Sequence, residues 1–147
     1  MSYKTQVLIS GNRKQVFEAI AQQVQNWWGN TDYSVSAIND EFTTSFGQTY
    51  WKFKISTFEP YATIVWSCID AKHIHDGYQG IEKEWIGTTV EWRLEAVNPN
   101  ETLLHFAHNG LVPNLNCYEI CFPAWERFVT KSLKSFIETG VGMPHLS

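Results

Sequence analysis

The N-terminal part of the chain combines a strand pattern with a helical one. Residues 3–10 are rich in strand-forming side chains and end at Gly11 and Asn12, which predicts a first β-strand followed by a turn. Asn12 with Gln15 three residues later is typical of the capping box that starts a helix. Apolar residues then recur at helical spacing, at Val16, Phe17, Ile20 and Val24. Polar residues dilute this apolar face towards Gly29, so the sequence predicts two short helices after the first strand.

The middle of the chain changes to a period of two, which is the spacing of a β-strand. β-branched and aromatic residues gather in segments with turn signals between them, at 41–46, 50–58, 62–69, 85–97 and 102–111. Val90, Trp92 and Leu94 share one face of the fourth segment, while Glu91 and Arg93 share the other. Alternation of this kind indicates an antiparallel sheet with one face covered and one face in water.

A helical pattern returns near the C-terminus, over residues 118–139. Its apolar stripe consists of Cys121, Trp125, Phe128, Val129, Ser132, Leu133 and Phe136. Gly140, Gly142 and Pro144 follow, which is typical of the end of a helix. One strand, two short helices, a run of five or six strands and a long helix together predict an α+β architecture. A curved sheet that grips one long helix leaves room for a cavity between them.

Composition indicates that the core is built from large rings. The chain has 147 residues, of which 44% are hydrophobic and 15% aromatic, and it includes 7 Trp. Charged residues make up only 18%, which excludes an intrinsically disordered chain. We find no repeat and no long linker, so we expect one domain over residues 1–147. A net charge of −4 without a basic run argues against a protein that binds duplex nucleic acid.

The N-terminal segment and the cysteines indicate in which cellular compartment the protein is expected. The N-terminal segment has no long apolar region with a cleavage site, which argues against a signal peptide. No stretch approaches the roughly 20 apolar residues that a membrane-spanning helix needs. The three cysteines, Cys68, Cys117 and Cys121, cannot all pair within one chain, and their spacing matches no zinc framework. A reducing cytoplasm is therefore the expected location.

Three motifs near the C-terminus resemble a known family. They are H-N-G-L-V-P at residues 108–113, C-x-x-x-W at Cys121 and Trp125, and the pair Ser132 and Leu133. Together with segments 16–30 and 84–97, they resemble the SRPBCC superfamily, in the branch related to the activator of the heat-shock-protein-90 ATPase. The resemblance implies the helix-grip fold. In that fold a curved antiparallel sheet of about six to seven strands wraps a long C-terminal helix over a cavity, with two short helices after the first strand.

Two groups of residues offer metal or thiol chemistry. His73, His75 and Asp76 form an H-x-H-D pattern that suits a metal ion. The surrounding segment has the composition of a polar loop and offers no third ligand, so we interpret it as a solvated loop and expect no metal site. Cys117 and Cys121 stand four residues apart near a helix start, where a thiolate is stabilised. Since Cys121 falls on the apolar stripe, we interpret these cysteines as core residues.

His108 is the candidate catalytic residue. It alternates with Leu104 and Phe106, which predicts that its ring points into the space between the sheet and the long helix. There it would serve as a general base or as a hydrogen-bond anchor for a ligand. The alternative is a neutral core histidine that a backbone carbonyl or a hydroxyl satisfies.

The leading hypothesis is a protein that holds a small hydrophobic ligand, lipid-like or aromatic, between the sheet and the C-terminal helix. The predicted ligand-binding residues are Trp66, Trp92, Phe106, His108, Trp125, Phe128 and Ser132. One alternative is a cyclase- or hydrolase-like enzyme that uses His108 as its general base. Another, which the resemblance implies, is a protein-interaction module of chaperone or stress pathways. The expected partner is the ligand, no cofactor is expected, and a homodimer and a chaperone partner stay open.

Overall fold

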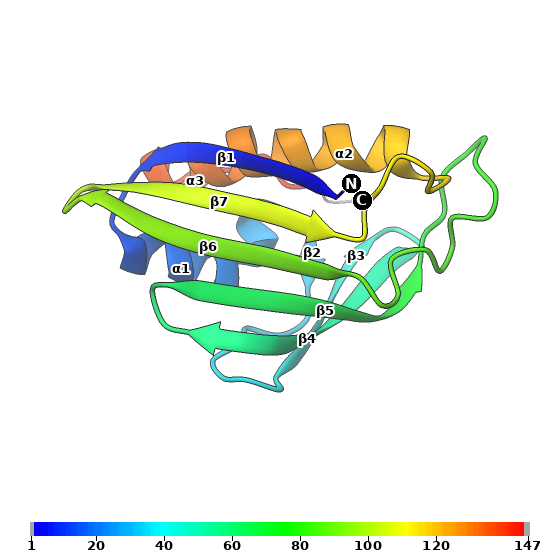
Figure 1. Cartoon of the computed structure of the whole chain (residues 1–147), viewed down its shortest axis with the longest axis horizontal. Helices are drawn as coiled ribbons and strands as arrows, with labels where there is room; N and C mark the ends of the chain where they lie inside the picture. Colours follow the sequence, from blue (N-terminus) through cyan, green and yellow to red (C-terminus); the bar gives the residue numbers. More distant parts are fainter. Residues whose placement is uncertain (1, 146–147) are drawn as a thin grey trace.

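Seven strands form one antiparallel sheet in the part of the chain that the computed structural model describes, residues 2–145 (Figure 1). Their order across the sheet is β1-β7-β6-β5-β4-β3-β2, so the first strand lies beside the last. The strands are β1 (Tyr3–Ser10), β2 (Asn30–Thr31), β3 (Glu41–Phe46), β4 (Thr49–Glu59), β5 (Thr63–Lys72), β6 (Thr89–Asn98) and β7 (Glu101–Asn109). The predicted antiparallel sheet of about six to seven strands is confirmed.

Helices lie behind the sheet in the view of Figure 1. They are α1 (Arg13–Gln22) with the short 3₁₀ turn η1 (Val24–Asn26), then the C-terminal helix made of α2 (Tyr118–Arg127), the π-helical segment η2 (Phe128–Leu133) and α3 (Lys134–Thr139). The capping box of α1 is confirmed, because the Gln15 amide donates to Asn12 Oδ1 at 2.9 Å and the Asn12 amide donates to Gln15 Oε1 at 2.9 Å. Within residues 2–145, no helix combines the length and the apolar character that crossing a membrane requires.

The C-terminal helix covers the predicted range but is not α-helical throughout. Pro123 lies inside α2, where its ring nitrogen has no hydrogen to donate to the carbonyl of Glu119. Beyond α2, the segment η2 follows the wider π-helical pattern, which rotates the residues after it relative to a regular α-helix. Phe128, Val129 and Ser132 in η2 are buried, so the predicted apolar stripe does face the core.

The strand predicted over 85–97 is wrong at its start, because β6 begins at Thr89. Gly87 has a φ of 91°, a left-handed conformation that breaks the extended chain. The carbonyl of Trp85 accepts hydrogen bonds from the Thr88 amide at 2.9 Å and from Thr88 Oγ1 at 2.6 Å, which closes a turn. This turn takes Trp85 out of the strand alternation and buries its side chain, which is only 3% exposed.

The following strand also ends earlier than the predicted range 102–111. It stops at Asn109, and Gly110 has a φ of 104°. A Cβ atom at Gly110 would lie 2.7 Å from the Cγ2 atom of Thr88, closer than side chains approach one another. Glycine at this position therefore lets the end of β7 pack tightly against the turn that carries Trp85.

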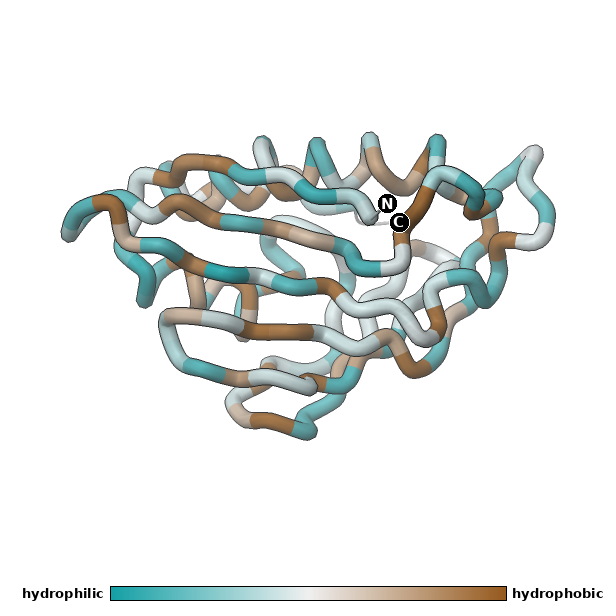
Figure 2. The backbone as a smooth tube through the Cα atoms, viewed as in Figure 1, coloured by the Kyte–Doolittle hydropathy of each residue, from teal (hydrophilic) through white to brown (hydrophobic). Residues whose placement is uncertain are grey.

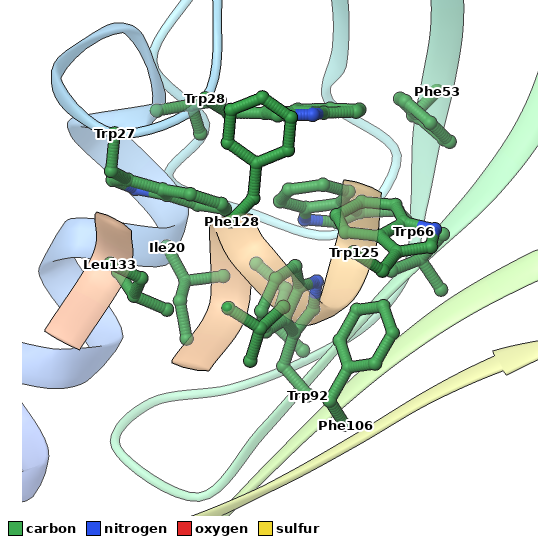
Figure 3. Close-up of a cluster of buried hydrophobic side chains, with 14 of the residues drawn as sticks. Ile20, Trp27, Trp28, Phe53, Trp66, Trp92, Phe106, Trp125, Phe128 and Leu133 are labelled. Carbon is green, nitrogen blue, oxygen red and sulfur yellow. The ribbon is translucent and has the colours of Figure 1, made fainter. Parts of the chain in front are cut away.

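Aromatic rings fill the interface between the sheet and the helices. Hydrophobic and hydrophilic residues alternate along parts of the strands (Figure 2). On β7 the side chains of Leu104, Phe106 and His108 are buried, as predicted. The largest fully buried side chains of the described residues include Trp27, Trp66, Trp92, Trp125, Phe53 and Phe106 (Figure 3). The sequence therefore places its bulkiest residues where the C-terminal helix meets the sheet.

Candidate functional site

A cavity of about 500 Å³ lies beside the C-terminal helix. Its walls come from the segment after η1, the end of β3, the start of β4, the loop after β5, the turn before β6 and one side of α2 and η2. Its aromatic lining residues are Trp28, Phe46, Trp51, Trp85, Trp125 and Phe128. This volume falls within the range of about 300–1,000 Å³ that is typical of small-molecule sites.

The four lining tryptophans stack in a ring, each against two others, with their planes nearly parallel. The ring centroids are 4.9 Å apart for Trp28 and Trp125, 5.8 Å for Trp125 and Trp85, 4.2 Å for Trp85 and Trp51, and 6.0 Å for Trp51 and Trp28. The interplanar angles of these pairs lie between 11° and 27°. Offset stacking of this kind is a favourable arrangement of aromatic rings. Four rings of nearly one orientation therefore border the cavity.

Polar groups supplement this aromatic wall. Exposed Glu119 and Arg127 reach it from α2, and exposed His75 reaches it from the loop after β5. The indole N–H group of Trp51 is buried and has no hydrogen-bond acceptor among the described residues. Buried indole N–H groups usually find a partner, so Trp51 departs from the common pattern.

A buried cluster of one histidine and two cysteines lies at the same cavity. The donor atoms of His73, Cys117 and Cys121 all lie within 4.8 Å of one another. His73 and Cys121 also line the cavity, whereas Cys117 is fully buried behind them. The prediction that Cys117 and Cys121 are core residues is confirmed by their exposures of 0% and 5%.

Backbone hydrogen bonds hold the members of this cluster in place. The His73 amide donates to the Glu82 carbonyl at 3.0 Å, within the loop between β5 and β6. The Cys117 amide donates to Glu84 Oε1 at 3.0 Å, which ties the start of α2 to the same loop. The Cys121 amide donates to the Cys117 carbonyl at 2.9 Å, in the first turn of the helix. These contacts join two loops that are far apart in the sequence.

The two thiols of the cluster differ in their affinity for protons. Hydrogen bonding with the Cys121 thiol lowers the pKa of Cys117. The same contact with Cys117, together with burial, raises the pKa of Cys121. Cys117 is therefore the member of the pair that becomes a thiolate first.

The seven residues predicted to bind a ligand separate into two groups. Trp125 and Phe128 line the cavity. The other five do not border it; they lie in the core and are at most 2% exposed: Trp66, Trp92, Phe106, His108 and Ser132. Figure 3 shows Trp66, Trp92 and Phe106 gathered around Trp125, so these rings support the wall of the cavity from behind.

His108 is held by two hydrogen bonds inside the core. The indole Nε1 of Trp125 donates to His108 Nδ1 at 2.9 Å, and His108 Nε2 lies 2.8 Å from Thr88 Oγ1. Since Thr88 donates its own proton to the Trp85 carbonyl, His108 Nε2 carries a hydrogen and donates it to Thr88. Burial lowers the pKa of His108 to about 3, so the ring is neutral. Both nitrogens are engaged, which favours a structural role over that of a general base.

Ser132 also makes structural hydrogen bonds. Its hydroxyl donates to the Trp27 carbonyl at 2.6 Å and accepts from the Met143 amide at 2.8 Å. These bonds connect η2 to the segment after η1 and to the C-terminal segment. Ser132 thereby helps to hold Trp27 against the C-terminal helix. The next residue, Trp28, is positioned by the same contact.

The H-x-H-D motif does not act as a unit in the structure. His75 and Asp76 are exposed, as a solvated loop predicts, but the interpretation is wrong for His73, which is only 8% exposed. His73 meets the two cysteines and not His75, and its ring lies 5.0 Å from that of Trp51. Neither this grouping nor the position of Trp85 at the cavity was predicted from sequence; Gly87 was the signal that Trp85 lies in a turn.

Comparisons with known proteins agree with this architecture. No protein-family model and no curated protein matches the sequence. Among solved structures, the Aha1 dimer from Colwellia psychrerythraea matches with a TM-score of 0.78 and 20% identity, over 97% of this chain and 99% of that one. DynU16, from the dynemicin biosynthetic locus, matches with a TM-score of 0.72 and 17% identity, over 99% of this chain and 51% of that one. Protein MLL2253 from Mesorhizobium loti matches with a TM-score of 0.70 and 17% identity, over 87% of this chain and 90% of that one.

At identities of 17–20%, these matches show a shared fold. The sheet order, the helices between β1 and β2, and the long C-terminal helix correspond to the predicted helix-grip architecture. The chain therefore has the helix-grip α+β fold that the sequence predicted, and it shares this fold with the Aha1 structure from Colwellia psychrerythraea.

Proposed function

We propose that the protein binds a small, flat, hydrophobic ligand in the aromatic cavity. The observation that carries this proposal is the set of nearly parallel rings of Trp28, Trp51, Trp85 and Trp125, all of which border the cavity. An aromatic pair gains about 0.5–1.5 kcal/mol beyond the area it buries. An aromatic ligand therefore gains more from this wall than an aliphatic chain of equal area, which favours an aromatic ligand over a lipid-like one.

The expected affinity follows from the area that such a ligand buries. A ligand that buries about 250 Å² of apolar surface gains roughly 6 kcal/mol at about 25 cal/mol per Å². The loss of translational and rotational freedom offsets a large part of this gain. We therefore expect dissociation constants of about 0.1–1 mM for simple aromatic compounds, which correspond to roughly 4–5.5 kcal/mol. Exposed Arg127 and Glu119 provide charges that would discriminate among substituents.

Filling the cavity is expected to weaken this binding. Ala124 lines the cavity from α2, so Ala124→Trp would occupy the space with an indole ring. We expect the variant to bind naphthol at least about 10-fold more weakly than the wild type, a loss of about 1.4 kcal/mol. Isothermal titration calorimetry measures this difference, with oleate as the lipid-like comparison.

The matched control is Ala96→Trp, which adds the same ring at an exposed position of β6. It should bind naphthol as the wild type does. Native mass spectrometry of freshly purified protein tests the same proposal without a chosen probe, because a stoichiometric apolar adduct would identify the ligand class. A wild-type protein that carries no adduct and gives no heat with naphthol, indole or oleate would contradict the proposal.

We also propose that two copies of the chain associate. Support comes from the fold shared with the Colwellia protein, which is named as a dimer. Sedimentation equilibrium is expected to give twice the monomer mass at a protein concentration of about 50 µM, decreasing on dilution. A monomer mass at every concentration would exclude the homodimer.

We further propose a reducing compartment such as the cytoplasm as the place of action. Cys68, Cys117 and Cys121 are all buried free thiols. Thiols persist where the redox potential keeps them reduced.

A further inference from the structure

The cluster of His73, Cys117 and Cys121 has the composition of a metal site. His73 follows the end of β5, Cys117 precedes α2, and Cys121 lies in the first turn of α2. All three side chains are buried, and their donor atoms lie within 4.8 Å of one another. In a tetrahedral site with Zn–S bonds of about 2.3 Å and Zn–N bonds of about 2.0 Å, the donor atoms lie roughly 3.5 Å apart. Small movements of these side chains would therefore complete the site.

We propose that His73, Cys117 and Cys121 bind a Zn²⁺ ion at the floor of the aromatic cavity. His73 and Cys121 border the cavity, so the fourth coordination position would face it. Three protein ligands with one open position are the arrangement of catalytic and ligand-binding zinc sites, whereas purely structural sites are closed by four. This proposal is independent of whether an aromatic ligand binds above the ion.

A second observation points to a ligand at the cluster. His73 is more than nine-tenths buried, and its Nδ1 atom has no hydrogen-bond partner among the described residues. A buried imidazole nitrogen without a partner carries a desolvation cost that a metal ion or a donor would remove. The other buried histidine, His108, shows the contrast, because both of its nitrogens have partners.

Hydrogen bonds from neighbouring residues fix the segments that carry the three cluster residues, as is common around metal ligands. The carboxylate of Glu84 accepts from the amides of Asn116 at 2.8 Å and Cys117 at 3.0 Å, and so orients the loop that carries Cys117. Thr49 Oγ1 accepts from the Ile74 amide at 3.0 Å and donates to the Ile74 carbonyl at 3.0 Å, which anchors the residue after His73 to β4. The segment that carries His73 is therefore fixed to the sheet, and the segment that carries Cys117 is fixed to the loop before β6.

The donor set selects the class of cation. Thiolate and imidazole ligands favour borderline or soft cations such as Zn²⁺, whereas Mg²⁺ and Ca²⁺ prefer oxygen ligands. On binding, the thiols of Cys117 and Cys121 would release their protons to solvent, and the two thiolates would balance the charge of Zn²⁺. The third cysteine, Cys68, is not in this cluster; its Sγ donates to the Asp70 carbonyl at 3.4 Å.

Metal loading of the full-length protein tests the proposal. Reduced protein is incubated with excess ZnSO₄ and desalted, and the bound zinc is measured by plasma mass spectrometry; we expect one equivalent. Co²⁺ in place of Zn²⁺ should give thiolate-to-cobalt charge-transfer absorption and the d–d bands of a tetrahedral site. Competition with a chromophoric chelator should show that Cys117→Ser and His73→Ala each weaken zinc binding by more than about 100-fold, beyond the loss typical of outer-shell changes.

Matched controls come from the same chain. Cys68→Ser removes a buried thiol outside the cluster, and His75→Ala removes an imidazole that lines the cavity but does not join the cluster. Both should retain one equivalent of zinc and the cobalt spectrum. No retained zinc in the wild type, or equal retention by Cys117→Ser, would overturn the proposal; the latter result would indicate an adventitious ion only.

A measurement on the wild type remains decisive where a variant fails to fold. Zinc should slow alkylation of Cys117 and Cys121 by iodoacetamide at least about 10-fold, as read by peptide mass mapping, because metal-bound thiolates are shielded from the reagent. Cys68 should react at the same rate with and without zinc. Unchanged rates at Cys117 and Cys121 would refute the site. Since no aromatic ligand is added, this outcome is separate from any failure of naphthol binding.

Discussion

The free energy of unfolding is expected to decrease by about 1.4 kcal/mol per pH unit as the pH falls below 6.5, through the contribution of His108 alone. Burial lowers its folded-state pKa from 6.5 to about 3. Between these two values the unfolded chain binds a proton that the folded protein does not, so acid favours unfolding. The contribution is fully present above pH 6.5 and is lost progressively towards pH 3, on the order of 5 kcal/mol in all.

Urea unfolding at a series of pH values measures this slope. His108→Gln removes the titrating ring and should make the slope shallower by about 1.4 kcal/mol per unit between pH 6.5 and 4.5. Below about pH 4.5, carboxylates also take up protons and obscure the effect. The control is Leu104→Ala, a buried residue on the same face of β7 that does not titrate, which should lower the stability at every pH and keep the slope. Identical slopes in wild type and His108→Gln would show that His108 does not stay neutral in the fold.

Trp28→Ala is expected to destabilise the protein by about 3–5 kcal/mol. The Trp28 side chain is 3% exposed, and its ring lies 4.9 Å from Trp125, 5.8 Å from Trp66 and 6.0 Å from Trp51. Removal of the indole loses its burial and leaves a void that these rings cannot fill by small shifts. The melting temperature should fall by roughly 10 °C, at about 2–4 °C per kcal/mol for a chain of this size.

Differential scanning calorimetry gives the melting temperature, and near-ultraviolet circular dichroism reports the loss of the stacked tryptophans. Trp28→Phe should recover part of the stability, because it keeps a smaller ring in the same place. Tyr33→Ala, at a side chain that is 52% exposed, should change the free energy of unfolding by less than about 0.5 kcal/mol. A Trp28→Ala variant that melts within a few degrees of the wild type would mean that this ring is not part of a packed core.

Most elements of the fold were predictable from sequence. The first strand was placed at the bounds that the structure has, and the capping box of Asn12 and Gln15 was recognised. The C-terminal helix over 118–139 was predicted as one element, although its π-helical middle was not. The predicted strand start at Trp85 was wrong because aromatic and β-branched residues continue the strand pattern across a turn that Gly87 makes.

The site was less predictable. Of the predicted ligand-binding residues, Trp125 and Phe128 line the cavity, whereas His108 and Ser132 were chosen because polar residues on an apolar face resemble anchors for a ligand. In the structure their hydrogen bonds to Trp125, Thr88 and Trp27 are internal to the core. A sequence pattern shows that a polar side chain points inward, but it does not show which partner it meets there.

The kind, order and inward faces of the elements follow from the spacing of hydrophobic residues, which is a local property with periods that differ between strand and helix. Which side chains meet in the core depends on the packing of the whole chain. His73 belongs to the loop after β5 and Cys117 to the loop before α2, and neither segment carries a signal of the other. Their approach depends on how the sheet curls and where the long helix packs, since non-local distances are set by packing of the whole chain and not by any single pattern.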